Sequence, residues 1–481
     1  MKKILTIAAV ILSGSAAWAF CGFYVAKADA KLFNKTSQVI LVRDGEKSTI
    51  TMSSDFQGDV KDFAMVIPVP VVLKKEDIRI SDRALFDKID AYSAPRMVEY
   101  YDNDPCYREP EYSRDYDMVP MMAESVAMDA METKSVGYQV KIEAKYTVGE
   151  YDILILSAKE SGGLERWLTD NGYKIPSGAK EVLDPYIKSN LKFFVVKVNL
   201  GELAKTGNKD LRPIQISFNS PKFMLPIRLG MANASGPQDM IVYAFTKSGR
   251  VEVTNYRTVE IPSNKNVPLF VQEKFGQFYK DLYTRAWKRE GKSVAFLEYS
   301  WDVSGYVTQF CDPCVGNPPM LNDFMSAGVD WVQQYHYGYQ GNVYFTRLHV
   351  TYDRATFPQD LQFQETPNKE QFQARYVITH PASGSFDCKE ANTYLIDLQK
   401  RRQQEISNMV ALAGWDAAAH VSYQSEYNKY IKKTGTKKTK QGGFFAWNMD
   451  ESPDFTVILL SLLSLSLVFF ALTRRPVPVN K

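Results

Sequence analysis

The chain has 481 residues, of which 45% are hydrophobic and 13% aromatic, and it carries a net charge of +3. Such a chain can bury a large core, which excludes an intrinsically disordered protein and allows about two or three domains. Without the five basic residues at its two ends, the net charge is −2. A nearly neutral protein lacks the basic surface that binds nucleic acid, so we expect no nucleic-acid partner.

Residues 1–19 have the pattern of a secretory signal peptide. Lys2 and Lys3 precede an apolar stretch, which ends at Ala17-Trp18-Ala19, a cleavage site made of small residues around one other. This segment is too short and wrongly flanked for a membrane span, and it directs export. We therefore expect a mature chain that begins at Phe20.

Residues 20–104 are predicted to be rich in strands. Two runs of β-forming residues flank Asp44-Gly45, a dipeptide typical of hairpin turns. Residues 62–72 are predicted to form a buried strand that Pro68 and Pro70 stop.

Residues 105–135 differ from the segments around them, because they are acidic and contain five methionines but few aliphatic residues. We interpret this segment as a long solvated loop. The alternative is a Cu(I) site at Met118, Met121 and Met122, because soft thioether ligands select that metal. The segment contains no histidine, and we expect no metal and no other cofactor.

Residues 136–427 are predicted to form the main α+β part, either as one domain with residues 20–104 or separately from them. Strands and helices are mixed here without a regular βαβ alternation, which is typical of an α+β fold. The capping signals and apolar stripes predict helices over the following ranges: from Ser81-Asp82 to about 92, 162–173, 268–290, and 387–414.

The C-terminal residues predict a membrane anchor. Residues 428–454 are rich in Lys, Thr and Gly and are expected to form a stalk. The eighteen residues 455–472 carry no charge, and as a helix they would span roughly 27 Å, enough for a bilayer core. Arg474 and Arg475 follow, and basic residues stay cytoplasmic. We therefore expect one transmembrane helix, a cytoplasmic tail over 473–481, and the bulk of the chain in the periplasm or outside the cell.

The five cysteines of the mature chain are interpreted first as disulfides, because export leads to an oxidising compartment. Cys311 and Cys314 form a Cys-Asp-Pro-Cys motif followed by Val-Gly-Asn-Pro-Pro, which favours a loop over the helix N-terminus that a redox site needs. We expect these two to be structural, bonded to each other or each to one of the remaining three, which are Cys21, Cys106 and Cys388.

Motifs of common enzyme classes are missing from the sequence. It contains no Gly-x-Ser-x-Gly, no His-Glu-x-x-His and no P-loop. His349 is the best catalytic candidate, because Arg347, Thr351 and Asp353 share its face of a predicted strand by alternation. It is either a general base or an ordinary polar residue of that face.

Several segments of the sequence resemble those of one protein family. They include CGFYVAKADAKLFNKTSQVILVRDGEKST near the N-terminus, GGLERWLTDNGYKIP in the middle, and WDVSGYVTQFCDPCVGNPP with the following TRLHVTYDRATFPQDLQ. The family is the bacterial domain of unknown function 2330, and the resemblance covers roughly 21–388. It implies an exported protein, often with a C-terminal anchor, and no known reaction or catalytic residue.

Two classes of function follow from these observations. We expect a membrane-tethered binding or assembly module of the bacterial envelope, with an envelope protein or a glycan as its partner. The alternative is an extracytoplasmic enzyme, either a thiol-redox protein at Cys311 and Cys314 or a hydrolase that uses His349. The first class needs only export, an anchor and a large surface, whereas the second needs an active site that the sequence does not assemble.

Overall fold

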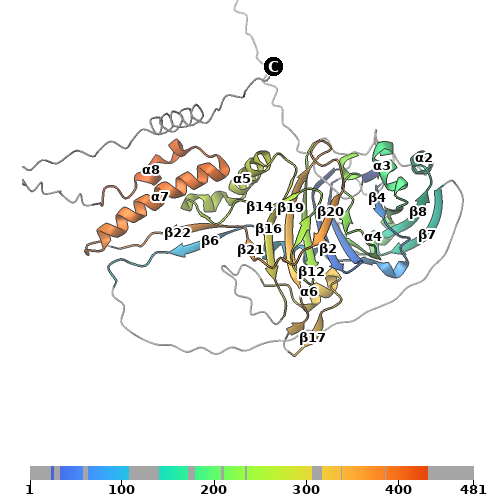
Figure 1. The fold of residues 1–481 in the computed structure, drawn as a ribbon, viewed down its shortest axis with the longest axis horizontal. Coiled ribbons are helices and arrows are strands. Elements are labelled where there is room, and N and C mark those ends of the chain that lie inside the picture. Colours follow the sequence, from blue (N-terminus) through green and yellow to red (C-terminus); the bar gives the residue numbers. More distant parts are fainter. Residues whose placement is uncertain are drawn as a thin grey trace, which may run out of the picture. The chain divides into compact units, whose positions relative to one another are not determined.

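Two β-sheets stacked face to face form the centre of the molecule, described here from a computed structural model (Figure 1). All described residues lie in one compact unit that ends at Ile431. The described ranges are 23–26, 33–57, 63–107, 140–171, 179–206, 211–232, 236–305, 317–336, 338–384 and 386–431.

The larger sheet has nine strands and mixes parallel with antiparallel pairs. Its central pair, β2 and β12, is parallel, although about 200 residues separate the two strands. In spatial order the strands are β14 (Arg257–Glu260), β16 (Val294–Asp302), β19 (Tyr344–Tyr352), β12 (Gln238–Thr246), β2 (Phe33–Asp44), β3 (Lys47–Gln57), β10 (Ile214–Asn219) and β5 (Ile78–Ile80), with β21 (Phe372–Gln373) paired to β16.

The second sheet has five antiparallel strands. In spatial order they are β1 (Phe23–Ala26), β4 (Phe63–Val69), β9 (Lys192–Val198), β8 (Tyr151–Ala158) and β7 (Val140–Val148). One face packs on the larger sheet, so that Ile67, Ile153 and Val196 join Val39 and Ile50 in one core. The other face is covered by α2 (Ser161–Asp170) and α3 (Ala179–Lys188) through a separate apolar cluster. The alternation of buried residues thus produces a sandwich of sheets with helices outside.

The opposite face of the larger sheet is covered by two further helices, α1 (Arg83–Ser93) and α6 (Leu321–Ala327). Phe86 and Ile89 of α1 and Phe324 of α6 pack against the apolar residues of β2, β12 and β19. Burying these aromatic and aliphatic side chains contributes roughly 1.5–3 kcal/mol each. Leu85 of α1, which packs in this layer, also lines a hollow between α1 and α6.

The C-terminal helices pack near a small parallel sheet. That sheet contains β15 (Lys265–Asn266), β22 (Arg375–His380) and β6 (Arg96–Tyr101), and α7 (Ala391–Ala413) contacts both β15 and α5 (Phe275–Arg289). The remaining elements are β11 (Met224–Leu225), β13 (Val251–Val253), β17 (Gln333–Tyr335), β18 (Gly338–Gln340), β20 (Leu361–Glu365), α4 (Leu200–Thr206), α8 (Val421–Ser425), η2 (Lys75–Asp77), η3 (Gly230–Ala232), η4 (Leu269–Lys274) and η5 (Ala417–His420).

Several local predictions are confirmed. The Asp44-Gly45 turn joins β2 to β3, and Gly45 adopts a positive φ of 56° that glycine tolerates without strain. Asp82 caps α1, because its side chain accepts a hydrogen bond from Ala84 N. Gly414 ends α7 with a φ of 76°.

Other boundaries differ from the prediction. The helix expected over 268–290 is divided into η4 and α5. The last helix begins at Ala391 with Glu390 as its cap, so the capping box expected at Asp387 does not form. Strand β4 continues through Pro68, because β1 pairs only with Phe63–Val66 and leaves β4 an edge strand at Pro68, where proline is tolerated.

The predicted fold class included a C-terminal transmembrane helix, and this part of the prediction is corrected. The mixed, sheet-rich architecture is observed, but no helix among the described residues is both long and apolar enough to cross a membrane. Helix α7 has 23 residues and carries charged side chains, including Lys400 and Arg401, along its length. Residues 455–472 lie outside the described ranges. The transmembrane helix is therefore not part of the fold that the structure supports.

Candidate functional site

The face of the larger sheet that α1 and α6 cover changes from apolar to charged along β19. Phe345 belongs to the apolar cluster under the helices. Arg347, His349 and Thr351 follow on the same face, because side chains alternate along a strand. All three residues are mostly buried. The side chain of Arg347 is 7% exposed and that of His349 is 15% exposed, and Thr351 is buried as well. Burial of such groups is tolerated only when they find partners.

A β-bulge supplies the main partner. Leu297 of β16 lies opposite Leu348 and Tyr299 lies opposite Arg347, so Glu298 is an extra residue between two consecutive positions of β19. As a result Leu297 and Tyr299 pack into different apolar clusters although they are two residues apart. A bulge redirects the side chain that it inserts. Here it brings the Glu298 carboxylate, which is 1% exposed, to Arg347 and His349.

Glu298 is bound by three donors. Arg347 Nε donates a 2.6 Å hydrogen bond to Oε2, and His349 Nδ1 lies 2.8 Å from Oε1. Tyr279 of α5 donates its hydroxyl to the same Oε1. A carboxylate that receives charge-assisted bonds from two cations is one of the strong polar arrangements in proteins.

Arg347 connects the sheet to α1. Its Nη1 donates a 2.7 Å bond to Asp90 Oδ1 and a 3.3 Å bond to Ser93 Oγ, both on α1. Tyr243 of β12 also donates to Asp90 Oδ1, at 2.6 Å, and its ring lies 5.3 Å from the guanidinium carbon. The orientation of α1 on the sheet is thereby fixed by polar contacts as well as by apolar packing.

His349 has a carboxylate near each ring nitrogen and a tyrosine ring against its ring. Its Nε2 lies 3.8 Å from Asp239 Oδ1, and the ring stacks on Tyr283 of α5 at 4.0 Å between centroids. Thr351 donates its hydroxyl to the same Asp239 oxygen. We call Asp90, Asp239, Glu298, Arg347 and His349 the buried charge network, in which Glu298 and Arg347 are the most buried and the side chains of Asp90 and Asp239 are 38% and 31% exposed.

The network shifts the pKa values of its members strongly. Burial on its own would raise the pKa of Glu298, but the charges and hydrogen bonds of His349 and Arg347 outweigh it and lower that pKa to about 2. Burial would lower the pKa of His349, but Glu298 and Asp239 raise it to about 9. The pKa of Asp239 is lowered, because His349 overcomes the effect of burial. At neutral pH His349 is therefore an imidazolium between two carboxylates.

This geometry argues against a general base at His349. A base needs a free ring nitrogen within reach of a substrate proton, and both nitrogens of His349 face carboxylates. The hydroxyl of Thr351 donates to Asp239, so it is not aimed at the ring as a nucleophile would be. The network instead acts as a buried polar clamp that joins β12, β16 and β19 to α1 and α5.

The stability of the protein is expected to vary with pH because of these two groups. The stability that Glu298 contributes is present above about pH 4.5, its ordinary pKa, and is lost as pH falls toward 2. The stability that His349 contributes is complete below about 6.5 and is lost as pH rises through 9. Melting temperatures measured between pH 5 and 9 should therefore fall on the alkaline side in the native chain, and less so in His349→Gln. Parallel curves for the two proteins would contradict this assignment.

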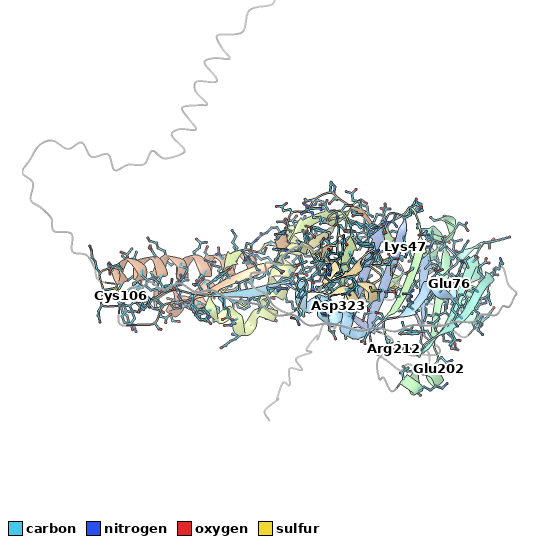
Figure 2. All side chains as sticks on the ribbon, turned by 90° about the horizontal axis from the view of Figure 1, so that it is seen from below. Lys47, Glu76, Cys106, Glu202, Arg212 and Asp323 are labelled. Atoms are coloured by element: carbon cyan, nitrogen blue, oxygen red, sulfur yellow. A yellow bond between two sulfur atoms is a disulfide. The ribbon has the colours of Figure 1, made fainter. Side chains whose placement is uncertain are left out.

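A polar hollow lies beside the same helix. Its volume is about 490 Å³, and β5, α1, β10 and α6 surround it. Lys88 of α1 forms an ion pair with Asp323 of α6, which is labelled in Figure 2. The buried amide of Gln215 donates to Thr51 Oγ1 at 2.8 Å and to Ser326 O at 2.9 Å. The volume falls within the roughly 300–1,000 Å³ range of small-molecule sites.

A second cavity lies between the two sheets and is much smaller. It is lined by apolar residues such as Met52, Ile67 and Ile216, and its volume is about 40 Å³. Such a space accommodates roughly three waters and no larger ligand without movement of the sheets. The hollow beside α1 is therefore the candidate binding site.

Comparison with family models gives one match. Residues 15–364 match the bacterial domain of unknown function 2330, which is described as an uncharacterized protein conserved in bacteria. The chain belongs to this family. The matched range includes every residue of the buried charge network and of the hollow, whereas Cys388 lies outside it. Neither the curated proteins nor the solved structures yield a match.

The structure places only some of the residues predicted from sequence. His349 and Arg347 lie together in the network, but Asp353 caps a turn by accepting from Ala355 N and Thr356 N. Cys106 and Cys388 form a disulfide. The other candidates lie outside the described residues, so their roles stay predictions; they are Cys21, Cys311, Cys314, Met118, Met121 and Met122.

The acidic half of the network was not predicted from the sequence. Glu298 stands in the apolar run Val-Ala-Phe-Leu-Glu-Tyr, and a lone carboxylate in a buried strand was a signal for a buried ion pair. Asp90 lies in the last turn of α1 and Asp239 is the second residue of β12. No local pattern distinguishes them from solvent-exposed carboxylates.

Proposed function

We propose that this domain is an exported binding module of the bacterial envelope and that its ligand site is the hollow beside α1. The observation that carries the proposal is the hollow itself, with a volume of about 490 Å³ and polar side chains from four elements converging on it. Pockets of this kind, with a few placed polar groups, are typical of binding sites.

The buried charge network supports this proposal by holding α1 in place. Asp90 and Ser93 on one side of α1 bind Arg347, while Leu85 and Lys88 of the same helix line the hollow. A site is most selective when rigid elements position its side chains. The network gives α1 that rigidity without chemistry at His349.

The disulfide supports a location outside the cytoplasm. Cys106 and Cys388 are 282 residues apart in sequence and are bonded. Disulfides persist in oxidising compartments and are rare in the cytosol of mesophiles. Together with the signal-peptide pattern of residues 1–19, this favours the periplasm or the cell exterior.

Site-specific photocrosslinking tests the proposal. A photoreactive amino acid replaces Met325, which lines the hollow and is 56% exposed, in the full chain expressed in its own bacterial envelope. We expect one discrete crosslinked component, because a ligand in the hollow would contact this side chain.

The matched control places the same amino acid at Val421 of α8, which is 57% exposed and does not line the hollow. The component should be missing from that variant. A component captured equally at both positions, or none at Met325, would show that the hollow is not a binding site.

A further inference from the structure

We infer that the hollow binds a ligand with one negative charge and several hydroxyl groups, namely a sugar acid whose carboxylate pairs with Arg79. This inference rests on the proposed function and names the chemistry of its ligand. Four features of the lining support it: an unpaired guanidinium, one hydroxyl without a partner, two carboxylates, and an apolar wall.

Arg79 is an exposed arginine of the lining, and its guanidinium is available to pair with an anion. It lies on β5 directly opposite Gln215 of β10, and both line the hollow. No residue that the structure describes forms a hydrogen bond or ion pair with its guanidinium. The other cation of the lining, Lys88, is already paired with Asp323. A guanidinium is planar and matches a carboxylate with two parallel hydrogen bonds.

Polar groups beside Arg79 are suited to hydroxyls. The Ser81 hydroxyl oxygen is buried and has no hydrogen-bond partner. An unsatisfied buried polar group costs about 1–3 kcal/mol, so rotation of this hydroxyl into the hollow, which Ser81 lines, would be favourable if a ligand hydroxyl paired with it there. The Gln215 side chain, which is 4% exposed, is fixed by Thr51 and Ser326 and forms a rigid polar floor.

The carboxylates of the lining restrict the charge of the ligand. Asp82 caps α1 and Asp323 pairs with Lys88, so both remain near the hollow as acceptors. They repel a multiply charged phosphate but accept hydrogen bonds from hydroxyl groups. We therefore expect a ligand with one negative charge, which pairs with Arg79. Its hydroxyl groups would donate hydrogen bonds to the carboxylates of Asp82 and Asp323.

The apolar part of the lining fits the C–H face of a sugar ring. Ile80, Leu85 and the exposed Met325 contribute this wall. Methionine adapts its shape to irregular partners. An ion such as free phosphate or sulfate would leave this wall without contact.

Isothermal titration of the full chain tests the inference with three probes: glucuronate, glucose and inorganic phosphate. We expect glucuronate to bind at least tenfold more tightly than glucose and phosphate. Its affinity should fall at higher salt, because a partly exposed ion pair is screened. Arg79→Gln should weaken glucuronate binding at least tenfold, whereas Arg79→Lys should weaken it less, since lysine keeps the charge but loses the two parallel bonds.

Arg354→Gln is the matched control, because Arg354 is exposed, has no partner among the described residues and does not line the hollow. It should bind as the native chain does. Equal affinities for glucuronate and glucose, or an unchanged affinity in Arg79→Gln, overturn the inference. If glucuronate fails to bind while Met325 still captures a component, only the ligand class is wrong. If both fail, the proposed function is wrong as well.

Discussion

Glu298→Gln is expected to lower the free energy of unfolding by about 3–5 kcal/mol, because it leaves Arg347 and His349 buried without their shared counter-charge. Glutamine keeps the shape of the side chain, so the loss reports charge rather than packing. The measurement is chemical denaturation of the full chain near pH 6, where both the carboxylate and the imidazolium are charged in the native protein.

Two controls separate the network from general effects of charge. Glu76→Gln removes an exposed carboxylate, with 68% of its side chain accessible and Lys74 at 3.8 Å, and should change stability by less than about 1 kcal/mol. Replacing Glu298 by Leu and Arg347 by Met together should recover part of the loss, since an apolar pair needs no counter-charge. If Glu298→Gln and Glu76→Gln behaved alike, the network would contribute nothing to stability.

Local signals predicted much of the secondary structure. The Asp44-Gly45 turn, the Asp82 cap of α1 and the Gly414 end of α7 are set by conformational preferences of one or two residues, so the sequence displays them directly. The parallel pairing of β2 with β12 could not be predicted in this way. It depends on which apolar faces meet after about 200 residues of intervening chain, and alternation alone does not rank the possible partners.

Only part of the candidate site could be predicted from the sequence. Alternation along β19 placed Arg347 and His349 on one face, which the structure confirms. The role of His349 could not be predicted, because its pKa depends on Glu298, and Glu298 reaches it only through a bulge. The hollow could not be predicted either, because its residues come from β5, α1, β10 and α6, and only the tertiary fold brings these elements together.

The disulfide joins two segments that the sequence could not pair. With five cysteines, several pairings were possible, and spacing does not choose among them. Cys106 follows β6 and Cys388 precedes α7; Cys106 is labelled in Figure 2. Noncovalent contacts join the segment after β6 to α7, because Arg401 of α7 donates two hydrogen bonds to Asp102, at 3.0 Å and 2.6 Å. The covalent bond and the ion pair therefore act together on one junction.

Replacing both Cys106 and Cys388 by Ser is expected to lower the free energy of unfolding by about 2–5 kcal/mol, near the upper end because the closed loop spans 282 residues. The Asp102–Arg401 pair should keep α7 in place, so the variant should still fold. Chemical denaturation with and without reductant measures the effect: reductant should destabilise the native chain more than the variant, which keeps only the cysteines Cys21, Cys311 and Cys314. Mass mapping of the non-reduced native chain should recover the Cys106–Cys388 peptide pair. A variant as stable as the oxidised native chain would show that the bond does not constrain the unfolded chain as its loop length predicts.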